Sequence, residues 1–568
     1  MCFHVKKGAG AFLHLCSLFF ISLIYSVPAQ AQVTNDTVVK EIDRPIREDV
    51  QERFKPVPLE VPAPAVIKPE APTGPTFMLR KINLIGVESL PMELFTPIIE
   101  KYEDTEVSLE GLNNLTTEIE KEYLKNGIIA ACFLPEQDIQ DGVVTLQVVE
   151  AKMGRLIVED HKYFRKSRID YYWDIENDEV LRYDKLYKNL QLMNKSSDRR
   201  VTSELKASDE PGKTDVYLNV DTHFPGHAFA TYDNEGSNFT GFERSGFGLR
   251  HNNLIGLDDS LISGYSFGND FESIYGYHRI PVSPVGTTFM YGHSYSNSIP
   301  KKDYASLDLE SITRSTSFFL YQDLYHDANY LGEVYAGLEA KDRQTRTIGI
   351  VTMWDRLRVW KFGGTYMLNS LNSTTAIQPE ISQGVNGLGS KGRNSLSSRN
   401  TRNVFTIASL KLQHQRQLAR SLQLNMKLQG QVASIKLPSS EVFYLGGIDS
   451  VRGYPSGDFF ADSGVQGNLE LLFPAFFIPE AVKSPLENKS LRDHITGVIF
   501  YDHGFGKKRG GQENIANPTG NLRSLGIGLR TRVFDKATVR TDWGFPIGDR
   551  AISEEGKSRF HLAFEFEY

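Results

Sequence analysis

One short segment has the residue types of a nucleophilic active site. Gly264, Ser266 and Gly268 form the Gly-x-Ser-x-Gly pattern of a nucleophile elbow, in which a serine on a sharp strand-to-helix turn attacks an acyl carbon. Here the odd positions from Leu261 to Phe267 continue one face of a strand, so Ser266 lies with the two glycines on the other face. No helical pattern follows. We therefore predict a strand at this position, and a protein that is not an enzyme.

Other kinds of chemistry are not indicated. The 13 histidines are scattered, without His-Glu-x-x-His or paired His/Cys spacing, so we expect no metal site. The glycine-rich segment Gly384–Gly392 lacks the Gly-Lys-Ser/Thr end of a phosphate loop and is interpreted as a mobile surface loop. No cofactor is expected. The net charge of −7 does not suggest nucleic acid, which favours basic patches.

A different pair of residues can form a strong electrostatic contact. Asp502 shares one face of a strand with Phe500 and Gly504. A carboxylate is costly against lipid, so if this strand crosses a membrane, that face should point into the interior of a barrel. Arg452 lies in a glycine-flanked loop tip that could fold back into such a barrel. We predict a charge-assisted bond between Arg452 and Asp502. The alternative is a solvated arginine and an aspartate in a turn.

The part of the chain that would position this pair has the pattern of β-strands. Beyond Asp221, apolar residues alternate with other residues, as in Leu422–Gln429, Val539–Phe545 and Phe560–Tyr568. Soluble sandwiches also alternate. The number of such segments, their aromatic ends and long polar connections such as residues 369–402 favour a transmembrane barrel. At roughly 20 to 22 residues per strand with its connection, residues 222–568 predict about 16 antiparallel strands.

The N-terminal region has the features of an exported protein. Lys6 and Lys7 precede the mostly apolar run Ala11–Tyr25. Ala29 and Ala31 then form the small-x-small pattern of a cleavage site, so residues 1–31 are predicted to be a signal peptide. Its removal would leave Cys132 as the only thiol, without an internal disulfide, and we expect a buried side chain there.

Two segments follow the signal peptide. Residues 32–55 carry apolar residues at every fourth position and predict a short charged helix; the alternative is an exposed, disordered tail. Residues 56–76 are a proline-rich linker.

Two α/β units are predicted between this linker and the barrel. Residues 77–153 have a β-α-α-β-β pattern, with helices near Met92–Lys101 and Leu112–Tyr123. Residues 154–221 repeat it more loosely, with a helix at Tyr183–Met193 and two strands around the turn Pro211–Gly212.

Several motifs, taken together and in order, resemble one protein family. The loop motif consists of Val451, Arg452, Gly453 and Tyr454, and the strand motif of Phe500, Asp502 and Gly504. They resemble the Val-Arg-Gly-Tyr and Phe-x-Asp-x-Gly signatures of two-partner secretion transporters, the haemolysin secretion/activation family. Leu134–Gly142 resembles the first POTRA domain of that family and Pro211–Asp215 the second. The opening barrel strands also fit, at Asp233–Ser237, Asn253–Asp259 and Tyr277–Pro281. The segment Asn253–Gly256 departs from the usual Asn-Pro-Leu-Gly.

The resemblance implies a fold class and a location. The fold would be a transmembrane β-barrel of about 16 antiparallel strands, residues 222–568, preceded by two α+β POTRA domains, residues 77–153 and 154–221. Residues 32–55 would be a plug helix in the lumen. The barrel would lie in the bacterial outer membrane and the POTRA domains in the periplasm. The resemblance also points to contact between Arg452 and Asp502.

The resemblance also implies a function. The protein would secrete a large partner exoprotein such as a haemolysin or adhesin, which is received unfolded in the periplasm and passes through a porin-like channel without nucleotide hydrolysis. Whether it also activates this partner stays open. Its other partners would be outer-membrane lipids and the barrel-assembly machinery that inserts it. Two alternatives stay open: a barrel-assembly insertase, which shares the loop motif but resembles chains with three to five POTRA units, and a passive porin, which needs no periplasmic domains.

Overall fold

The computed structural model describes most of the chain beyond the N-terminal region. The described residues are 76–139, 141–237, 239–326, 330–391, 396–484, 490–510, 519–534, 536–549 and 558–568. The signal peptide, the plug helix and nearly all of the proline-rich linker predicted from the sequence lie outside them. Within the described residues, no helix has both the length and the apolar character needed to cross a bilayer.

The first α/β unit, unit 1, packs one long helix against a small sheet. Its elements are β1 (Phe77–Leu79), β2 (Lys81–Ile85), η1 (Met92–Leu94), α4 (Thr96–Glu100), β3 (Thr105–Val107), α5 (Leu109–Lys125), β4 (Ala130–Phe133) and β5 (Val143–Glu150). The sheet has the order β2-β5-β4, and β1 pairs with β3. Leu112, Leu115, Ile119 and Tyr123 recur every three or four residues, so they share one face of α5 and are buried.

The second unit, unit 2, repeats this order of elements. It contains β6 (Lys152–Glu159), α6 (Lys166–Tyr171), α7 (Tyr183–Met193), β7 (Arg199–Ala207) and β8 (Lys213–Thr222). Its sheet has the order β6-β8-β7. Leu186, Leu190 and Met193 of α7 pack with Val216 and Leu218 of β8. The short helix α6 was not predicted from the sequence.

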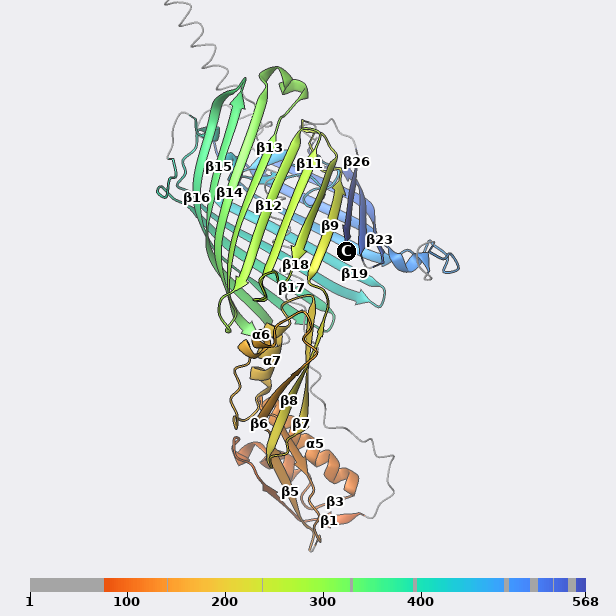
Figure 1. Ribbon diagram of the computed structural model, residues 1–568. Coiled ribbons are helices and arrows are strands. Elements are labelled where there is room, and N and C mark those ends of the chain that lie inside the picture. The colour runs from red at the N-terminus through yellow and green to blue at the C-terminus, as the bar shows by residue number, and fades with distance from the viewer. Residues whose placement is uncertain are drawn as a thin grey trace, which may run out of the picture.

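The remaining chain forms a closed barrel of sixteen strands, in which β26 returns to pair with β9, which confirms the predicted fold class (Figure 1). The strands are β9 (Gly226–Asp233), β10 (Arg244–His251), β11 (Ser260–Gly268), β12 (Phe271–Pro281), β13 (Thr287–Ser298), β14 (Leu309–His326), β15 (Tyr330–Thr347), β16 (Ile350–Ser370), β17 (Ser373–Gly384), β18 (Thr406–Ala419), β19 (Leu422–Ala433), β22 (Ser463–Pro474), β23 (Ile495–Lys507), β24 (Thr519–Val533), β25 (Ala537–Pro546) and β26 (Arg559–Glu567).

The barrel strands separate polar from apolar side chains. Because successive residues point to opposite faces of a strand, alternation places one set outside and the other inside. Exposed apolar residues include Phe247, Ile274, Phe318, Trp360, Ile499, Tyr501, Ile527 and Trp543. Buried polar residues include Ser294, Thr313, Glu339, Lys341, Arg343, Asp502, Asp542 and His561. An apolar exterior around a polar interior is the pattern of a barrel that spans a membrane.

One sequence-based interpretation was wrong. Residues 369–402 were expected to be a long polar connection, but residues 373–384 form strand β17. The strand was missed because its alternation is weak and because Pro379 lies inside it. The β16–β17 pairing is interrupted around Pro379, while the pairing of β17 with β18 continues through it. Proline has no N–H to donate, so it is tolerated only where one side of the strand lacks a partner.

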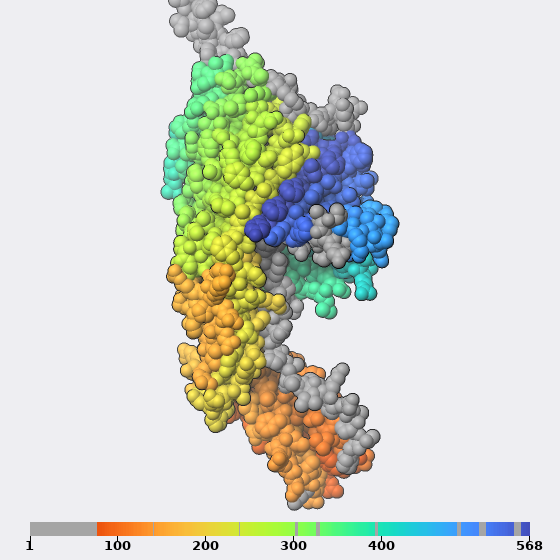
Figure 2. All heavy atoms as spheres, turned by 45° about the vertical axis from the view of Figure 1, so that its right-hand side comes forward, coloured from red at the N-terminus to blue at the C-terminus, as the bar shows by residue number. Residues whose placement is uncertain are grey.

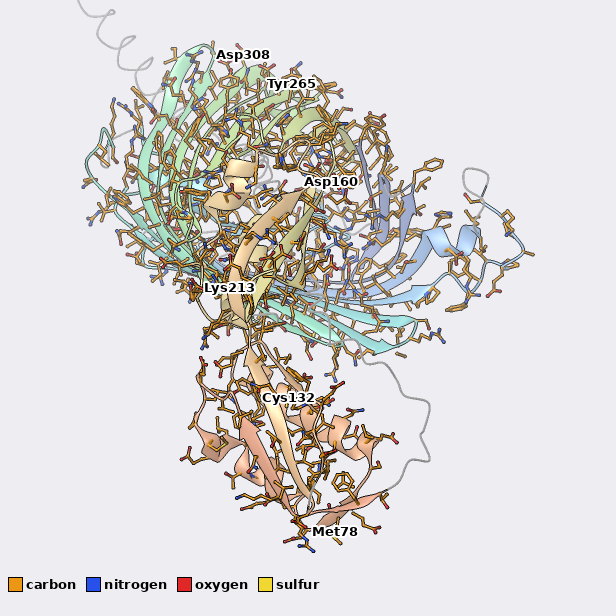
Figure 3. The ribbon with its side chains drawn as sticks, turned by 60° about the horizontal axis from the view of Figure 1, so that its bottom comes forward. Met78, Cys132, Asp160, Lys213, Tyr265 and Asp308 are labelled. Carbon is orange, nitrogen blue, oxygen red and sulfur yellow. The ribbon has the colours of Figure 1, made fainter. Side chains whose placement is uncertain are left out.

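Unit 2 is fixed to the rim of the barrel by buried polar contacts. Arg199 forms an ion pair of 2.9 Å with Asp258 in the β10–β11 connection, and both side chains are almost fully buried. The neighbouring Asp198 accepts a hydrogen bond of 2.8 Å from Asn252 and contacts His227 of β9. Helices α6 and α7 lie directly against the barrel (Figure 1), and unit 1, with Met78 and Cys132, lies beyond unit 2 (Figure 3).

The thiol of Cys132 provides a test of the packing in the core of unit 1. Cys132 is buried in the core of unit 1, and burial raises the pKa of its thiol to about 12. Thiolates react with maleimides and thiols do not, so we expect no labelling of the folded protein at pH 8 and complete labelling in urea, measured as a gel shift with polyethylene glycol maleimide. Equal labelling with and without urea would show that this core is open.

Candidate functional site

The candidate site is a loop that folds onto the inner wall of the barrel. Residues 443–461, called the lumen loop below, lie between β19 and β22 and contain the paired strands β20 (Phe443–Leu445) and β21 (Phe459–Ala461). Apolar side chains of the loop pack with one another and with Leu522 of the wall. Gly446 has φ of +101°, which favours glycine and allows the chain to turn after β20.

Arg452 and Asp502 are in direct contact, as the sequence predicts. Nε and Nη2 of Arg452 donate to the two carboxylate oxygens of Asp502, each over 2.7 Å. The main-chain N–H of Arg452 also donates to Asp502, over 3.0 Å. The guanidinium lies 3.5 Å from the centre of the Phe500 ring. Both charged side chains are at most 1% exposed, so neither can be hydrated in place of this contact.

The remaining charges around Arg452 balance in sign. Its Nη1 atom also donates to Glu470 of β22, over 2.5 Å. Asp542 of β25 accepts hydrogen bonds from Arg530 and Arg540, each over 2.8 Å. Three guanidinium groups thus meet three carboxylates, on the loop and on the strands β22 to β25. We call the six residues the charge cluster: Arg452, Glu470, Asp502, Arg530, Arg540 and Asp542.

The other motif residues allow the loop to approach the wall closely. A Cβ atom at Gly504 would lie 2.7 Å from Leu445 and 2.9 Å from Val451. Gly453 has φ of +90° and lies against the main chain of Gly544. The hydroxyl of the buried Tyr454 donates to the main-chain oxygen of Asp549, over 2.8 Å. The structure therefore brings together all seven predicted site residues.

Sequence reasoning missed a second anchor of the loop. The main-chain N–H of Gly453 donates to Nε2 of His561, over 2.9 Å, so the proton of a neutral ring is on Nδ1. That nitrogen contacts Glu235, over 2.6 Å, and Glu235 also accepts from the N–H of Ile448, over 2.9 Å. His561 lies on β26 and Glu235 follows β9, so this anchor joins the loop to the strands that close the barrel. Both side chains are at most 2% exposed.

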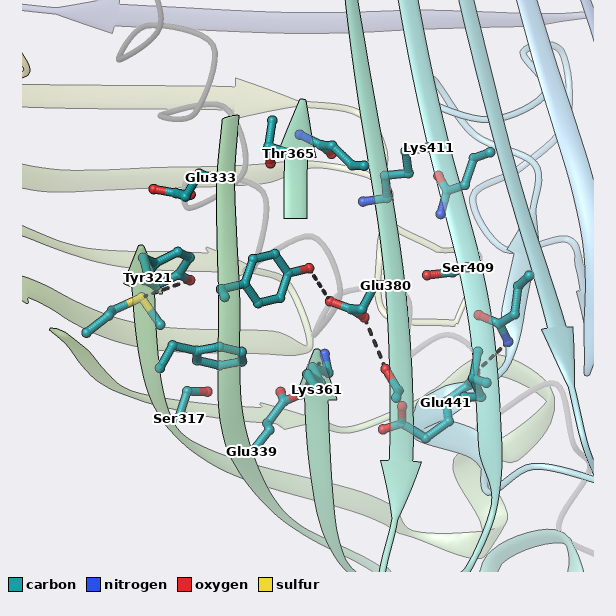
Figure 4. A pocket seen from close by; sticks show the side chains of 18 of the residues that line it. Ser317, Tyr321, Glu333, Glu339, Lys361, Thr365, Glu380, Ser409, Lys411 and Glu441 are labelled. Atoms are coloured by element: carbon teal, nitrogen blue, oxygen red, sulfur yellow. Dashed lines mark hydrogen bonds and ion pairs between the residues drawn. The ribbon is translucent and has the colours of Figure 1, made fainter. Parts of the chain in front are cut away.

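The lumen also contains a polar cavity away from the charge cluster (Figure 4). Its volume is about 200 Å³. The buried Glu339 contacts Lys341 and Lys361, over 3.2 and 2.8 Å, and Tyr335 donates to Glu380 over 2.7 Å. Tyr321 and Phe319 add aromatic faces. A wall of paired charges and aromatic rings can contact both polar and apolar groups.

The architecture and the site together define a class of protein. A sixteen-stranded barrel with an apolar exterior, a polar lumen, a loop anchored inside it and an α/β unit fixed at one rim has the architecture of an outer-membrane barrel protein. The model of the family described as "Haemolysin secretion/activation protein ShlB/FhaC/HecB" matches residues 212–531. The model described as "POTRA domain, ShlB-type" matches residues 77–151.

Individual proteins show the same relationship. The heme/hemopexin transporter protein HuxB of Haemophilus influenzae is 24% identical over 500 residues, which cover 82% of each chain. The outer membrane transporter CdiB of Dickeya dadantii is 24% identical over 445 residues, 76% of this chain and 77% of that one. The structure of CdiB from Escherichia coli has a TM-score of 0.70 at 18% identity, covering 94% of this chain and 98% of that chain.

The chain belongs to the haemolysin secretion/activation family, and it is an outer-membrane transporter of two-partner secretion. The units that precede the barrel lie in the periplasm, so the barrel end that contacts unit 2 is the periplasmic rim.

Variants of Arg452 and Asp502 test the contact between loop and wall. Removing one partner of a buried ion pair leaves the other charge uncompensated, at a cost of about 3 to 5 kcal/mol. We expect Arg452→Ala and Asp502→Ala each to lower the unfolding temperature of the barrel in detergent, and the double variant to be little worse, because coupled residues are not additive. Arg346→Ala is the matched control, since Arg346 pairs with Glu310 at a partly exposed site. Additive losses in the double variant would contradict the coupling.

Proposed function

We propose that this transporter secretes one large exoprotein, a haemolysin or an adhesin, which enters unfolded from the periplasm. The observation that carries the proposal is the fixed position of unit 2 against the periplasmic rim of a barrel with a polar lumen. The two units are proposed to be the two POTRA domains, over residues 77–153 and 154–221. Outer-membrane lipids would surround the barrel, and the barrel-assembly machinery would insert it.

The loop motif is proposed to shape the conduit. Its four residues, Val451, Arg452, Gly453 and Tyr454, and the wall residues Phe500, Asp502 and Gly504 fix the lumen loop to β23. Because each contact is buried, the loop has one position on the wall and leaves the rest of the lumen for the passing chain. Variants that release Arg452 or Asp502 should therefore impair export more than they impair assembly of the barrel.

Unit 2 offers a strand edge to an unfolded chain. Strand β7 is at the edge of its sheet. The main-chain N–H and oxygen of Val201 bond with Asn194 on the outer side, over 2.6 and 2.9 Å. Main-chain groups alternate in direction along an edge strand, so Ser203 and Leu205 point theirs to the same outer side. An extended cargo segment can add to such an edge by main-chain hydrogen bonds, which require no fixed sequence.

A proline substitution tests capture at this edge. Ser203→Pro removes an outward N–H but leaves the inward hydrogen bonds of β7 in place, so we expect reduced export with a normal amount of barrel at the surface. Ser203→Ala retains the N–H and is expected to export normally. Deletion of residues 77–221 should abolish export and leave an inserted barrel. Wild-type export by Ser203→Pro would place cargo capture elsewhere, and export by the deletion variant would refute a role for both units.

The insertase alternative has weaker support. A structure of BamA from Haemophilus ducreyi that lacks POTRA domains 1–3 has a TM-score of 0.56 at 13% identity, covering 87% of this chain and all of that shortened one, which shows a shared fold alone. Within the described residues, two α/β units precede the barrel. The secretion family is expected to have two such units, whereas assembly proteins are expected to have three to five.

A further inference from the structure

The connection between β22 and β23 differs from the others at the periplasmic rim. The other connections there have between two and eight residues, whereas this one runs from residue 475 to residue 494 and includes η5 (Leu491–His494). Outer-membrane barrels ordinarily have short periplasmic turns. We call its described residues, 475–484 and 490–494, the side lobe. It projects sideways from the barrel wall, level with the C-terminal end of the chain (Figures 1 and 2).

The side lobe continues the apolar outer surface of the barrel. Tyr501 and Ile499 of β23 are exposed and pair in register with Leu469 and Leu471 of β22. The next residue on this outer face is Phe473, whose ring covers Gly497.

A chain of aromatic rings leads from Phe473 into the lobe. The rings of Phe473 and Phe476 have centres 5.5 Å apart, and those of Phe476 and Phe477 are 6.2 Å apart. Phe476 and Phe477 are 67% and 58% exposed, and Val482 is also exposed. An aromatic surface of this kind is unfavourable in water unless a nonpolar phase covers it.

The base of the lobe holds this aromatic surface in place. The N–H of Leu491 donates to the main-chain oxygen of Val482, over 2.9 Å. Glu480 forms an ion pair of 2.9 Å with Arg492, and His494 contacts the main-chain oxygen of Arg532 on β24, over 3.0 Å. The lobe is therefore tied to the barrel wall at two strands, and its phenylalanines project from a defined support.

The lobe connects β22 and β23, which have 12 and 13 residues, and β24 separates it from the shortest part of the wall. Strands β9, β10, β11, β25 and β26 have 8 to 10 residues, whereas β14 to β16 have 18 to 21. A transmembrane strand needs about 9 to 11 residues, so the short strands leave little apolar height to spare. Aromatic side chains are preferred at the boundary between acyl chains and headgroups.

We propose that the side lobe is an interfacial membrane anchor, in which Phe476 and Phe477 insert among phospholipids of the periplasmic leaflet beside the short wall. The charged pair Glu480 and Arg492 would lie at headgroup level. The lobe would thus extend the apolar belt sideways and fix the tilt of the barrel at its closing strands. The partner of this surface is a lipid layer, because the surface is continuous with strand faces that already contact lipid.

Spin-label accessibility tests the proposal on the mature chain, from which the signal peptide with Cys2 and Cys16 has been removed. A nitroxide at Phe477→Cys, in a Cys132→Ala background and in vesicles of phosphatidylethanolamine and phosphatidylglycerol, is expected to collide more with oxygen than with a water-soluble nickel chelate. Its depth should fall between two controls: a label at Ile499→Cys on the lipid-facing wall and one at Asp209→Cys on unit 2, where the native side chain is 93% exposed.

Each outcome decides the proposal. Intermediate depth for Phe477→Cys, together with weaker retention of the Phe476→Ser/Phe477→Ser double variant in vesicles than in detergent, supports the anchor. Nickel accessibility equal to that of Asp209→Cys would overturn it. Dipolar broadening between labels on separate copies would also overturn it, because the lobe would then bind a second copy of the chain. Dilution with unlabelled protein removes dipolar broadening between separate copies and so identifies that result.

Discussion

The burial of the Arg452 charge is the constraint on which the site depends. An arginine in proteins does not lose its proton, so a buried guanidinium needs carboxylates and hydrogen-bond acceptors around it. Asp502 supplies two acceptors and Glu470 a third. Asp542 completes the balance with Arg530 and Arg540. Because these groups come from separate strands, the arginine can be satisfied only when the wall has closed in register and the loop is docked on it.

The loop in turn connects distant parts of the barrel. Asp502 and Glu470 lie on the adjacent strands β23 and β22, whereas His561 and Glu235 lie where the first and last strands meet. The periplasmic rim of the barrel is tied to unit 2 through Arg199 and Asp258. The periplasmic entrance, the lumen and the closing strands thus form one continuous structure, along which we propose that an unfolded chain passes from unit 2 into the polar lumen.

Much of the fold could be predicted from the sequence. Alternation gave the barrel and its approximate strand number, and the helical spacing of Leu112, Leu115 and Ile119 gave α5. The contact between Arg452 and Asp502 followed from strand parity and from the family motifs. Strand β17 was missed because Pro379 breaks its pattern.

The second anchor could not be found because no local pattern joins Glu235 to His561, which are brought together by closure of the barrel. A polar residue at an inward position of the last strand was the one available signal for His561. The side lobe was likewise hidden, because exposure of Phe476 and Phe477 is a tertiary property.

We infer that the lumen loop stays docked on the wall while cargo passes. Releasing Arg452 would expose several buried charges at once, and transport across this membrane is expected to proceed without nucleotide hydrolysis to drive such a change.

A reversible covalent link between the loop and the wall tests this inference most directly. The hydroxyl of Ser450 in the loop donates to the side chain of Gln466 on β22, over 2.5 Å, so a short bifunctional thiol reagent can join Ser450→Cys to Gln466→Cys. If the loop stays docked, the linked variant exports cargo at the same rate as the variant whose link has been reduced. Loss of export on linking, with recovery after reduction, would show that the loop must leave the wall and would contradict a loop that stays docked.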